Sequence, residues 1–417
     1  MPGNLRDRLK RIQQVKQVEK AAHVAEGVDL SRFDGQGWVP VGSFVLRREV
    51  DCGENIELPQ RMPDAAGVVM PGMCGGTAYE DLLFFDLETS GLSGGAGTVA
   101  FLAAFGRLAV TGRAGPKTVL CRLRITQYLL LDYPGEYDFV EAMLGEFNAA
   151  GKAADVTMVS YNGKSFDSQI LKTRCLMNGI VPPEYRHADL LHPARRLWKR
   201  LLPDCSQATI ETGVLGIDRT GDIPGAMAPE IWFALLKHGE TEPLLGICEH
   251  NRRDIAGLAA IFSALVSIAH DPFGAAKKFN FDLEALALRW YESSRYEADT
   301  TLCATGQRLL RHAAETGHPR ALLTYALTLL KERKYGEGRE ALCKAASSDN
   351  PLSIQAAALR ALAIDSEHRL KNPSQALSFT EQALKLLSPD SPRCQDFERR
   401  RQRLKNIDQR MNTNEHE

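Results

Sequence analysis

Residues 83–88 read LFFDLE, an apolar run that ends in two carboxylates, Asp86 and Glu88. In a β-strand, side chains two positions apart point to the same face, so these two acids lie side by side. Like charges repel, and burying either one without a partner costs free energy. The pattern predicts a positive partner between them, and a divalent cation is the obvious candidate. A solvated strand end is the alternative, and it is the commoner case for a single motif of this kind.

Length and composition limit the class of protein. A chain of 417 residues is long enough for two or three domains, and 44% hydrophobic with 25% charged residues is typical of soluble globular proteins. A net charge of −1 excludes a global basic field, so any nucleic-acid surface must be a local patch. Nine cysteines without a C-x-x-C pair indicate neither a disulfide framework nor a zinc site. We expect a cytoplasmic protein without a signal peptide, a membrane span or a membrane partner.

The middle of the chain predicts an α/β fold. LLFFDLE (82–88), GTVAFLAAFGRLAV (97–110) and TVLCRLRITQYLLL (118–131) are strand patterns joined by short turns, which predicts an antiparallel meander. Two further strand patterns, VTMVSYNG and RHADLLH, then alternate with helical patterns. The order predicts a mixed five-stranded sheet flanked by helices.

The strand patterns end near residue 282. Residues 283–390 are rich in Ala and Leu, and small residues recur seven positions apart at Gly338 and Ala345 and at Ala376 and Ala383. This spacing resembles the tetratricopeptide repeat in three degenerate copies, with an ordinary helical bundle as the alternative. The predicted organisation is a basic N-terminal helix (1–26), an extended lead-in (27–80), the α/β domain (81–270), a linker (271–282), helical repeats (283–390) and a charged C-terminal tail (391–417).

Two more acids lie where they can converge on the first pair. Asp167, in YNGKSFD, follows a buried strand at the start of a helix, where an N-terminal capping role is the alternative. Asp254, in HNRRD, lies on a helix whose other face is apolar, and a surface position is the alternative there. Taken in order with Asp86 and Glu88, the four acids indicate one site.

Three motifs resemble those of the DEDD-type 3′→5′ exonucleases, namely F-D-L-E-T-S-G-L, Y-N-G-K-S-F-D and H-N-R-R-D. The segments GGAGTVAFLAAFG, HADLLHPARRLW and DIPG are most similar to the YprB-like branch of the ribonuclease H-like superfamily. This resemblance covers residues 82–266. It implies a ribonuclease H-like fold and hydrolysis of phosphodiester bonds at the 3′ end of a nucleic acid.

The resemblance also implies the cofactor and the roles of the acids. Two Mg²⁺ or Mn²⁺ ions can activate water and stabilise the leaving oxyanion, and such hard cations prefer carboxylate ligands. Asp86 would bridge both ions, and Glu88 and Asp254 would complete the site that activates water. Asp167 would hold the second ion, largely through water.

His250 is the predicted general base or water-orienting residue. It precedes Asp254 by four positions, which places both on one face of a helix. The histidine subclass of the superfamily has this residue five positions before the last Asp, and the tyrosine subclass has a tyrosine four before it. The spacing here leaves the role of His250 open, with a hydrogen-bonded surface histidine as the alternative and Glu249 as the residue at the five-position spacing.

Four neighbours are predicted to contact substrate. By resemblance, Thr89 and Leu92 would contact the terminal nucleotide, although a turn cap and a packed leucine are the alternatives. Asn162 would contact sugar-phosphate, and Phe166 would stack on a base or pack in the core. The expected partner is a single-stranded DNA or RNA end, with a protein partner on the helical repeats.

Three functions follow from these observations. The first is a metal-dependent 3′→5′ exonuclease on single strands. The second is a structure-specific endonuclease of the same fold, and the third is a non-catalytic scaffold that binds nucleic acid or protein through its repeats. Four acids brought together without metal would repel one another, which disfavours the third.

Overall fold

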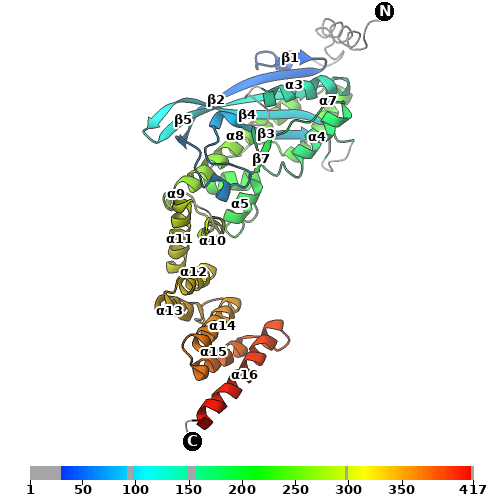
Figure 1. Cartoon of the computed structure of the whole chain (residues 1–417). Helices are drawn as coiled ribbons and strands as arrows, with labels where there is room; N and C mark the ends of the chain where they lie inside the picture. The colour runs from blue at the N-terminus through cyan, green and yellow to red at the C-terminus, as the bar shows by residue number, and fades with distance from the viewer. Residues whose placement is uncertain (1–29, 92–96, 149–155, 296–298, 415–417) are drawn as a thin grey trace, which may run out of the picture. The chain divides into compact units, whose positions relative to one another are not determined.

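The computed structural model describes residues 30–91, 97–148, 156–295 and 299–414, with side chains to residue 407 in the last helix. The predicted basic helix within residues 1–26 lies outside the described residues. The chain forms two compact units (Figure 1), which we name unit 1 (Met1–Phe281) and unit 2 (Asp282–Glu417). Each unit is described by itself below.

A mixed sheet forms the centre of unit 1, in the strand order β1-β2-β5-β4-β3-β6-β7. Strands β3, β4 and β5 form the predicted antiparallel meander, and β6 and β7 continue from β3 in parallel. The prediction of a mixed α/β sheet is therefore confirmed. The strands are β1 (Val39–Gly42), β2 (Val45–Pro59), β3 (Leu82–Thr89), β4 (Ala100–Gly115), β5 (Thr118–Leu130), β6 (Thr157–Ser160) and β7 (Arg186–Asp189).

The sheet has seven strands instead of the predicted five, because the lead-in supplies β1 and β2. Strand β2 pairs antiparallel with β5, from Val45 opposite Leu130 to Pro59 opposite Thr118. Without β2, one edge of β5 would expose a row of unpaired backbone groups. Pairing of this kind depends on backbone N–H and C=O groups, which every sequence has. The short, interrupted apolar pieces of the lead-in therefore did not indicate a long strand.

Helices pack on this sheet and connect its strands (Figure 1). The helices of unit 1, with 3₁₀ and π turns labelled η, are η1 (Leu30–Phe33), α2 (Ala66–Val69), η2 (Tyr79–Asp81), η3 (Tyr133–Gly135), α3 (Glu136–Asn148), α4 (Asp167–Met177), α5 (Leu191–Trp198), α6 (Gln207–Ile210), η5 (Glu211–Leu215), η6 (Gly225–Met227), α7 (Ala228–His238), α8 (Glu242–His270) and α9 (Pro272–Lys278). Helix α9 falls in the predicted linker. Trp198 Nε1 donates to the carbonyl oxygen of Asn280 over 2.8 Å, which ties this stretch to unit 1.

The alternation of side chains along β3 decides which way its acids point. The ring of Phe84 meets that of Phe262 on α8 at 5.4 Å, edge to face, whereas the ring of Phe85 stacks at 5.1 Å on that of Phe105 from β4. Asp86 and Glu88 share the face of Phe84, because they follow it by two and four positions. The acids therefore point toward α8.

Helix α8 lies close against the sheet. A Cβ at Gly106 on β4 would lie 2.6 Å from Cγ2 of Ile255, so a glycine is needed at this crossing. By length and composition α8 is apolar enough to cross a membrane, but 61% of that stretch is buried inside the unit. Core helices pass the same test, and the packing of α8 on strands β2 to β5 identifies it as one.

Unit 2 is all-helical in its described residues. Consecutive helices pack as pairs (α10 with α11, α12 with α13, α14 with α15), and α16 packs on α15. The small residues Gly338, Ala345, Ala376 and Ala383 are buried, and a Cβ at Gly338 would lie 2.8 Å from Leu330 Cδ2. Paired helices are thus confirmed, whereas the tetratricopeptide type stays a prediction. The helices are α10 (Leu283–Ser294), α11 (Thr300–Glu315), α12 (Pro319–Lys331), α13 (Tyr335–Ala345), α14 (Leu352–His368), α15 (Pro373–Leu386) and α16 (Pro392–Asn414).

Candidate active site

A pocket of 270 Å³ in unit 1 brings together acids that lie far apart in the sequence. Asp86 and Glu88 come from β3, Asp167 comes from the first turn of α4, and Asp254 and His250 come from α8. All five residues predicted for catalysis therefore border one cavity. The remaining lining residues are Leu87, Thr89, Tyr161, Asn162, Phe166, Gly225 and Pro229.

A buried chain of hydrogen bonds orients the carboxylate of Asp86. Asn251 Nδ2 donates to Asp86 Oδ2 over 2.7 Å, and Asn251 Oδ1 accepts from Gln127 Nε2 over 2.8 Å. Gln127 Oε1 in turn accepts from Arg48 Nε over 2.6 Å, and the guanidinium of Arg48 lies 4.8 Å from the ring centre of Trp38. Strand β2 therefore supports the site through Arg48, although its sequence gave no sign of such a role.

The turn before α4 positions Asp167. A Cβ at Gly163 would lie 2.5 Å from Ser160 Oγ and 3.1 Å from Asp167 Oδ2, so the glycine lets the turn pack against both side chains. Asp189, at the end of β7, accepts from the backbone N–H groups of Asn162 over 2.8 Å and Lys164 over 3.1 Å. These bonds hold Asn162 at a φ of 65°, in the left-handed region. Asp189 thus has a structural role in shaping the turn.

His250 lies between two carboxylates. Its Nδ1 is 3.0 Å from Asp222 Oδ2, and its Nε2 is 3.3 Å from Asp254 Oδ2. A Cβ at Gly225 would lie 2.9 Å from Nε2, so the glycine leaves room for the imidazole. The four-position spacing brings the histidine to the pocket on a helix that is regular there.

Glu249, at the five-position spacing, is engaged elsewhere. Its carboxylate accepts from Arg252 over 2.6 and 2.8 Å and from Arg253 over 3.2 Å, and it does not line the pocket. Its bond to Arg252 lowers the pKa of the carboxyl, although burial opposes this shift. The geometry therefore favours His250 as the residue that faces the acids.

Arg219 and Asp222 contact the site residues Asp254 and His250 without lining the pocket, and sequence reasoning missed both. Arg219, whose side chain is 12% exposed, donates from Nη2 to Asp254 Oδ1, from Nη1 to Asp222 over 2.6 Å and from Nε to Glu211 over 2.5 Å. A Cβ at Gly257 would overlap the Glu211 carboxylate, so this glycine admits the acid. The DIPG segment, which begins at Asp222, was the one available signal, and its resemblance to YprB-like sequences assigned no role to the acid.

Negative charge accumulates in the pocket. Burial raises the pKa of Asp86 well above its usual range, and the charges of Asp254, Asp167 and Glu88 raise it further, against a lowering by Asn251. Burial also raises the pKa of Glu88 well above its usual range, followed by the charges of Asp254 and Asp167. Bringing these carboxylates together in ionised form therefore requires positive charge beyond that of Arg219.

The donor set fits a hard divalent cation. Ligand atoms of Glu88, His250 and Asp254 lie within 4.8 Å of one another. The carboxylate oxygens of Asp254 already accept from Arg219 or approach His250, but each oxygen has a further lone pair for an ion. Oxygen-rich sites of this type suit Mg²⁺ or Mn²⁺.

Three of the four predicted substrate-binding residues border the pocket, and Leu92 lies outside the described residues. Thr89 Oγ1 donates to the carbonyl oxygen of Gly91 over 2.9 Å, so its hydroxyl also serves the following turn. Phe166 packs partly on the hydrophobic core, while the backbone of Asn162 is held by Asp189. Their contacts with substrate stay a prediction.

The metal-free protein should lose stability as pH rises. Burial raises the pKa of Asp167 to about 7 from an ordinary value of 3.8, a backbone hydrogen bond opposes the shift, and Asp189 adds to it. Between these values the folded state binds more protons than the unfolded state, so each such group lowers the free energy of unfolding by roughly 1.4 kcal/mol per pH unit. Thermal unfolding in EDTA should therefore show a midpoint that falls from pH 5 to about pH 7.

The variant Asp167→Asn isolates this contribution. Asparagine cannot ionise, so the thermal midpoint of the variant should exceed that of the wild type by a margin that widens as pH rises. Added Mg²⁺ should raise the wild-type midpoint at pH 7 and raise that of the variant less. A constant margin between the two proteins across this pH range would contradict the expected shift of Asp167.

Comparisons with known proteins place this site in a known class. The RNase H superfamily model matches residues 83–266, which contain all four acids and His250. Unit 1 is therefore an RNase H-like domain.

A relative that aligns with most of the chain identifies the family more closely. The chain is 33% identical over 312 residues to a protein of Bacillus subtilis (strain 168) named "Uncharacterized protein YprB", with 73% of this chain and 69% of the relative covered. It therefore belongs to the family of YprB.

Among solved structures, the chain is similar to a protein in an "ExoI/SSB-Ct complex", with a TM-score of 0.28 and 16% sequence identity. The match covers 47% of this chain and 42% of the other, so this chain spans less than half of that protein. A likeness at this level supports no argument about activity.

Proposed function

We propose that the protein is a divalent-metal-dependent nuclease that removes nucleotides from the 3′ end of single-stranded nucleic acid. The observation that supports this most directly is the convergence of four carboxylates and His250 on one pocket of an RNase H-like domain. The 3′→5′ direction and the single-stranded end rest on the resemblance of the three motifs to DEDD-type exonucleases.

Asp86, Glu88, Asp167 and Asp254 would hold two Mg²⁺ or Mn²⁺ ions. When bound, such ions lower the pKa of water and stabilise the charge of the scissile phosphate and leaving oxygen. The chain supplies orientation: Asn251 fixes the carboxylate of Asp86, and Arg219 fixes that of Asp254.

His250 would accept the proton of the attacking water. Asp222 Oδ2 lies 3.0 Å from Nδ1 on the side of the ring away from Asp254, so this carboxylate helps to hold the imidazole with Nε2 toward the acids. Nε2 faces the acids from α8, close to Asp254. Asn162 and Phe166 border the same cavity and would contact the sugar-phosphate and the base of the terminal nucleotide.

Product patterns test the proposal. Single- and double-stranded DNA and RNA, labelled at the 5′ end, are incubated with the full chain in Mg²⁺ or Mn²⁺ and, as the control, in EDTA. A ladder of progressively shorter labelled products from single strands, absent in EDTA, is the expected result. Discrete internal cuts would instead indicate an endonuclease. Binding without any cleavage in either metal would indicate a scaffold and overturn the assignment.

A further inference from the structure

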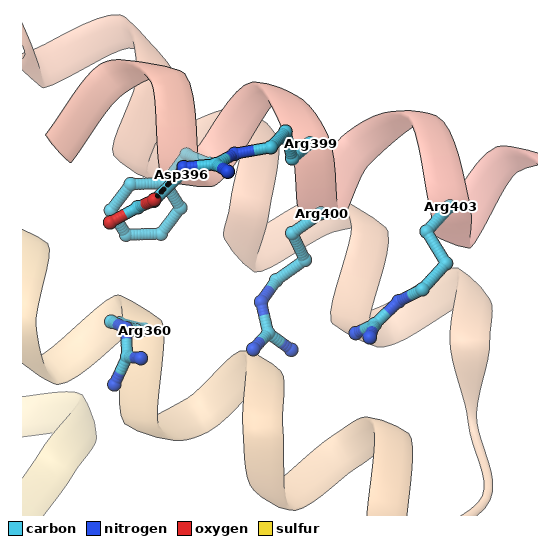
Figure 2. Close-up of a pocket in the computed structure, with 6 residues that line it drawn as sticks. Arg360, Asp396, Arg399, Arg400 and Arg403 are labelled. Carbon is cyan, nitrogen blue, oxygen red and sulfur yellow. Dashed lines mark hydrogen bonds and ion pairs between the residues drawn. The ribbon is translucent and has the colours of Figure 1, made fainter. Parts of the chain in front are cut away.

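A second pocket, in unit 2, is lined mainly by arginines. It has a volume of 350 Å³. It lies between α14 and α16, which are joined by a hydrogen bond from Arg400 on α16 to Glu367 on α14. Figure 2 shows Arg400 and Arg403 extending from α16 toward α14, which carries Arg360. The lining residues are Arg360, Asp396, Phe397, Arg399, Arg400 and Arg403.

A largely buried acid holds two of these arginines in place. The Glu367 side chain, 9% exposed, accepts from Arg400 Nη1 over 2.6 Å and from Arg403 Nη2 over 2.7 and 2.8 Å. Arg403 remains half-exposed, so N–H groups not used by Glu367 stay available to a ligand. The arginines are therefore oriented before any ligand arrives, which lowers the entropy cost of binding.

Positive charge exceeds negative charge around this pocket. Four guanidinium groups face two carboxylates, since Glu367 is shared and Asp396 accepts from Arg399 over 2.6 Å. Exposed Arg360 has no acid partner in the part of the chain that the structure describes. Burial lowers the pKa of Arg400, and nearby Arg403 and Arg360 lower it further, against a rise from Glu367. An anion in the pocket would relieve this repulsion.

The chemistry of the pocket favours a phosphate over a peptide carboxylate. Guanidinium groups match either anion, but peptide recognition also needs apolar pockets for side chains. Phe397 is the one apolar lining residue and is itself only 4% exposed, so it offers little surface to such an anchor. Phosphate backbones are bound chiefly through Arg and Lys, without side-chain pockets.

The sequence of α16 extends the basic surface beyond the pocket. The whole chain has a net charge of −1, so this concentration is local. The first part of the helix, to residue 407, contains two acidic residues, Asp396 and Glu398. It contains six basic residues, namely Arg393, Arg399, Arg400, Arg401, Arg403 and Lys405.

From these observations we infer that the arginine pocket of unit 2 binds a backbone phosphate of single-stranded nucleic acid, as an anchor additional to the candidate active site. The choice of nucleic acid as the source of the phosphate rests on the proposed function. The presence of an anion-binding pocket does not.

Binding in EDTA tests the inference without requiring hydrolysis. The full chain and the double variant Arg360→Gln/Arg403→Gln are titrated against a short labelled single-stranded oligonucleotide, with fluorescence anisotropy over a series of salt concentrations. The variant should bind about tenfold more weakly, and its log Kd should depend less on log salt, by roughly 0.7 for each phosphate that it no longer neutralises. The double variant Arg311→Gln/Lys344→Gln removes the same charge from exposed residues outside both the pocket and α16, each ion-paired to a glutamate, and should bind like the wild type.

Two competitors distinguish the sources of the anion. Inorganic phosphate should weaken oligonucleotide binding by the wild type more than by the pocket variant. An acidic peptide of equal charge should bind both proteins equally. The inference is overturned if both double variants bind the oligonucleotide with the same affinity. It is also overturned if the pocket variant binds the oligonucleotide normally and has lost only its affinity for inorganic phosphate, or only its affinity for the acidic peptide. Because EDTA removes catalysis, a protein without nuclease activity can still give any of these results.

Discussion

Replacing Asp86 by asparagine is expected to abolish metal-dependent hydrolysis while raising the stability of the metal-free protein. Asp86 is one of the acids that would hold the metal, and removing even a hydrogen-bonding partner of a metal ligand typically costs about 10–100-fold in metal affinity or activity. The loss here should therefore exceed about 10³-fold in kcat/KM. Asparagine retains an oxygen that can accept from Asn251, so the buried chain to Gln127 and Arg48 can persist.

The stability measurement separates a chemical defect from a folding defect. Burial and three neighbouring carboxylates raise the pKa of Asp86, so removing its charge relieves repulsion and should raise the thermal midpoint in EDTA. The matched control is Glu80→Gln, which removes an exposed acid just before the same strand and should leave activity within about twofold. If Asp86→Asn cleaved end-labelled single strands at close to the wild-type rate, the nuclease proposal would be contradicted.

Replacing His250 by alanine is expected to cost about 10²–10⁴-fold in kcat, the usual worth of a positioned acid–base group. His250→Gln sharpens this test, because glutamine can hydrogen-bond but cannot accept the proton of water at neutral pH. If the histidine is the base, Gln and Ala variants should be similarly impaired. Recovery of most activity by Gln would show that hydrogen bonding or packing is its contribution. His238→Ala, on the exposed end of α7, serves as the control and should be unaffected.

The affinity for metal distinguishes two possible roles of His250, a general base and a metal ligand. A ring nitrogen of His250 lies within 4.8 Å of carboxylate oxygens of Glu88 and Asp254, close enough to share an ion with them. Calorimetric titration with Mn²⁺ should give nearly the same Kd for His250→Ala as for the wild type if the residue is a base. Asp222→Asn should lower kcat by about 10–100-fold with unchanged Mn²⁺ binding, because it acts through the orientation of His250. A strong loss of Mn²⁺ affinity in His250→Ala would make the histidine a ligand instead.

Local periodicity accounts for the parts of the fold that were predicted correctly. The apolar runs of β3, β4 and β5 are long and joined by short turns, so the meander could be read from residues 82–131. The paired helices of unit 2 were visible in their Ala and Leu spacing for the same reason. Strands β1 and β2 were not, because their pairing depends on backbone groups that no side-chain pattern reports.

The same division holds in the candidate site. By itself the sequence determined that Asp86 and Glu88 share one face of a strand and that His250 and Asp254 share one face of a helix, because strand and helix periods are local properties. Only the tertiary structure decided that these faces meet and that His250 instead of Glu249 turns to the pocket. It also decided that Arg219 and Asp222 join them. The pocket brings together residues up to 168 positions apart (Asp86 and Asp254), and this depends on how closely α8 approaches the sheet, which Gly106 permits.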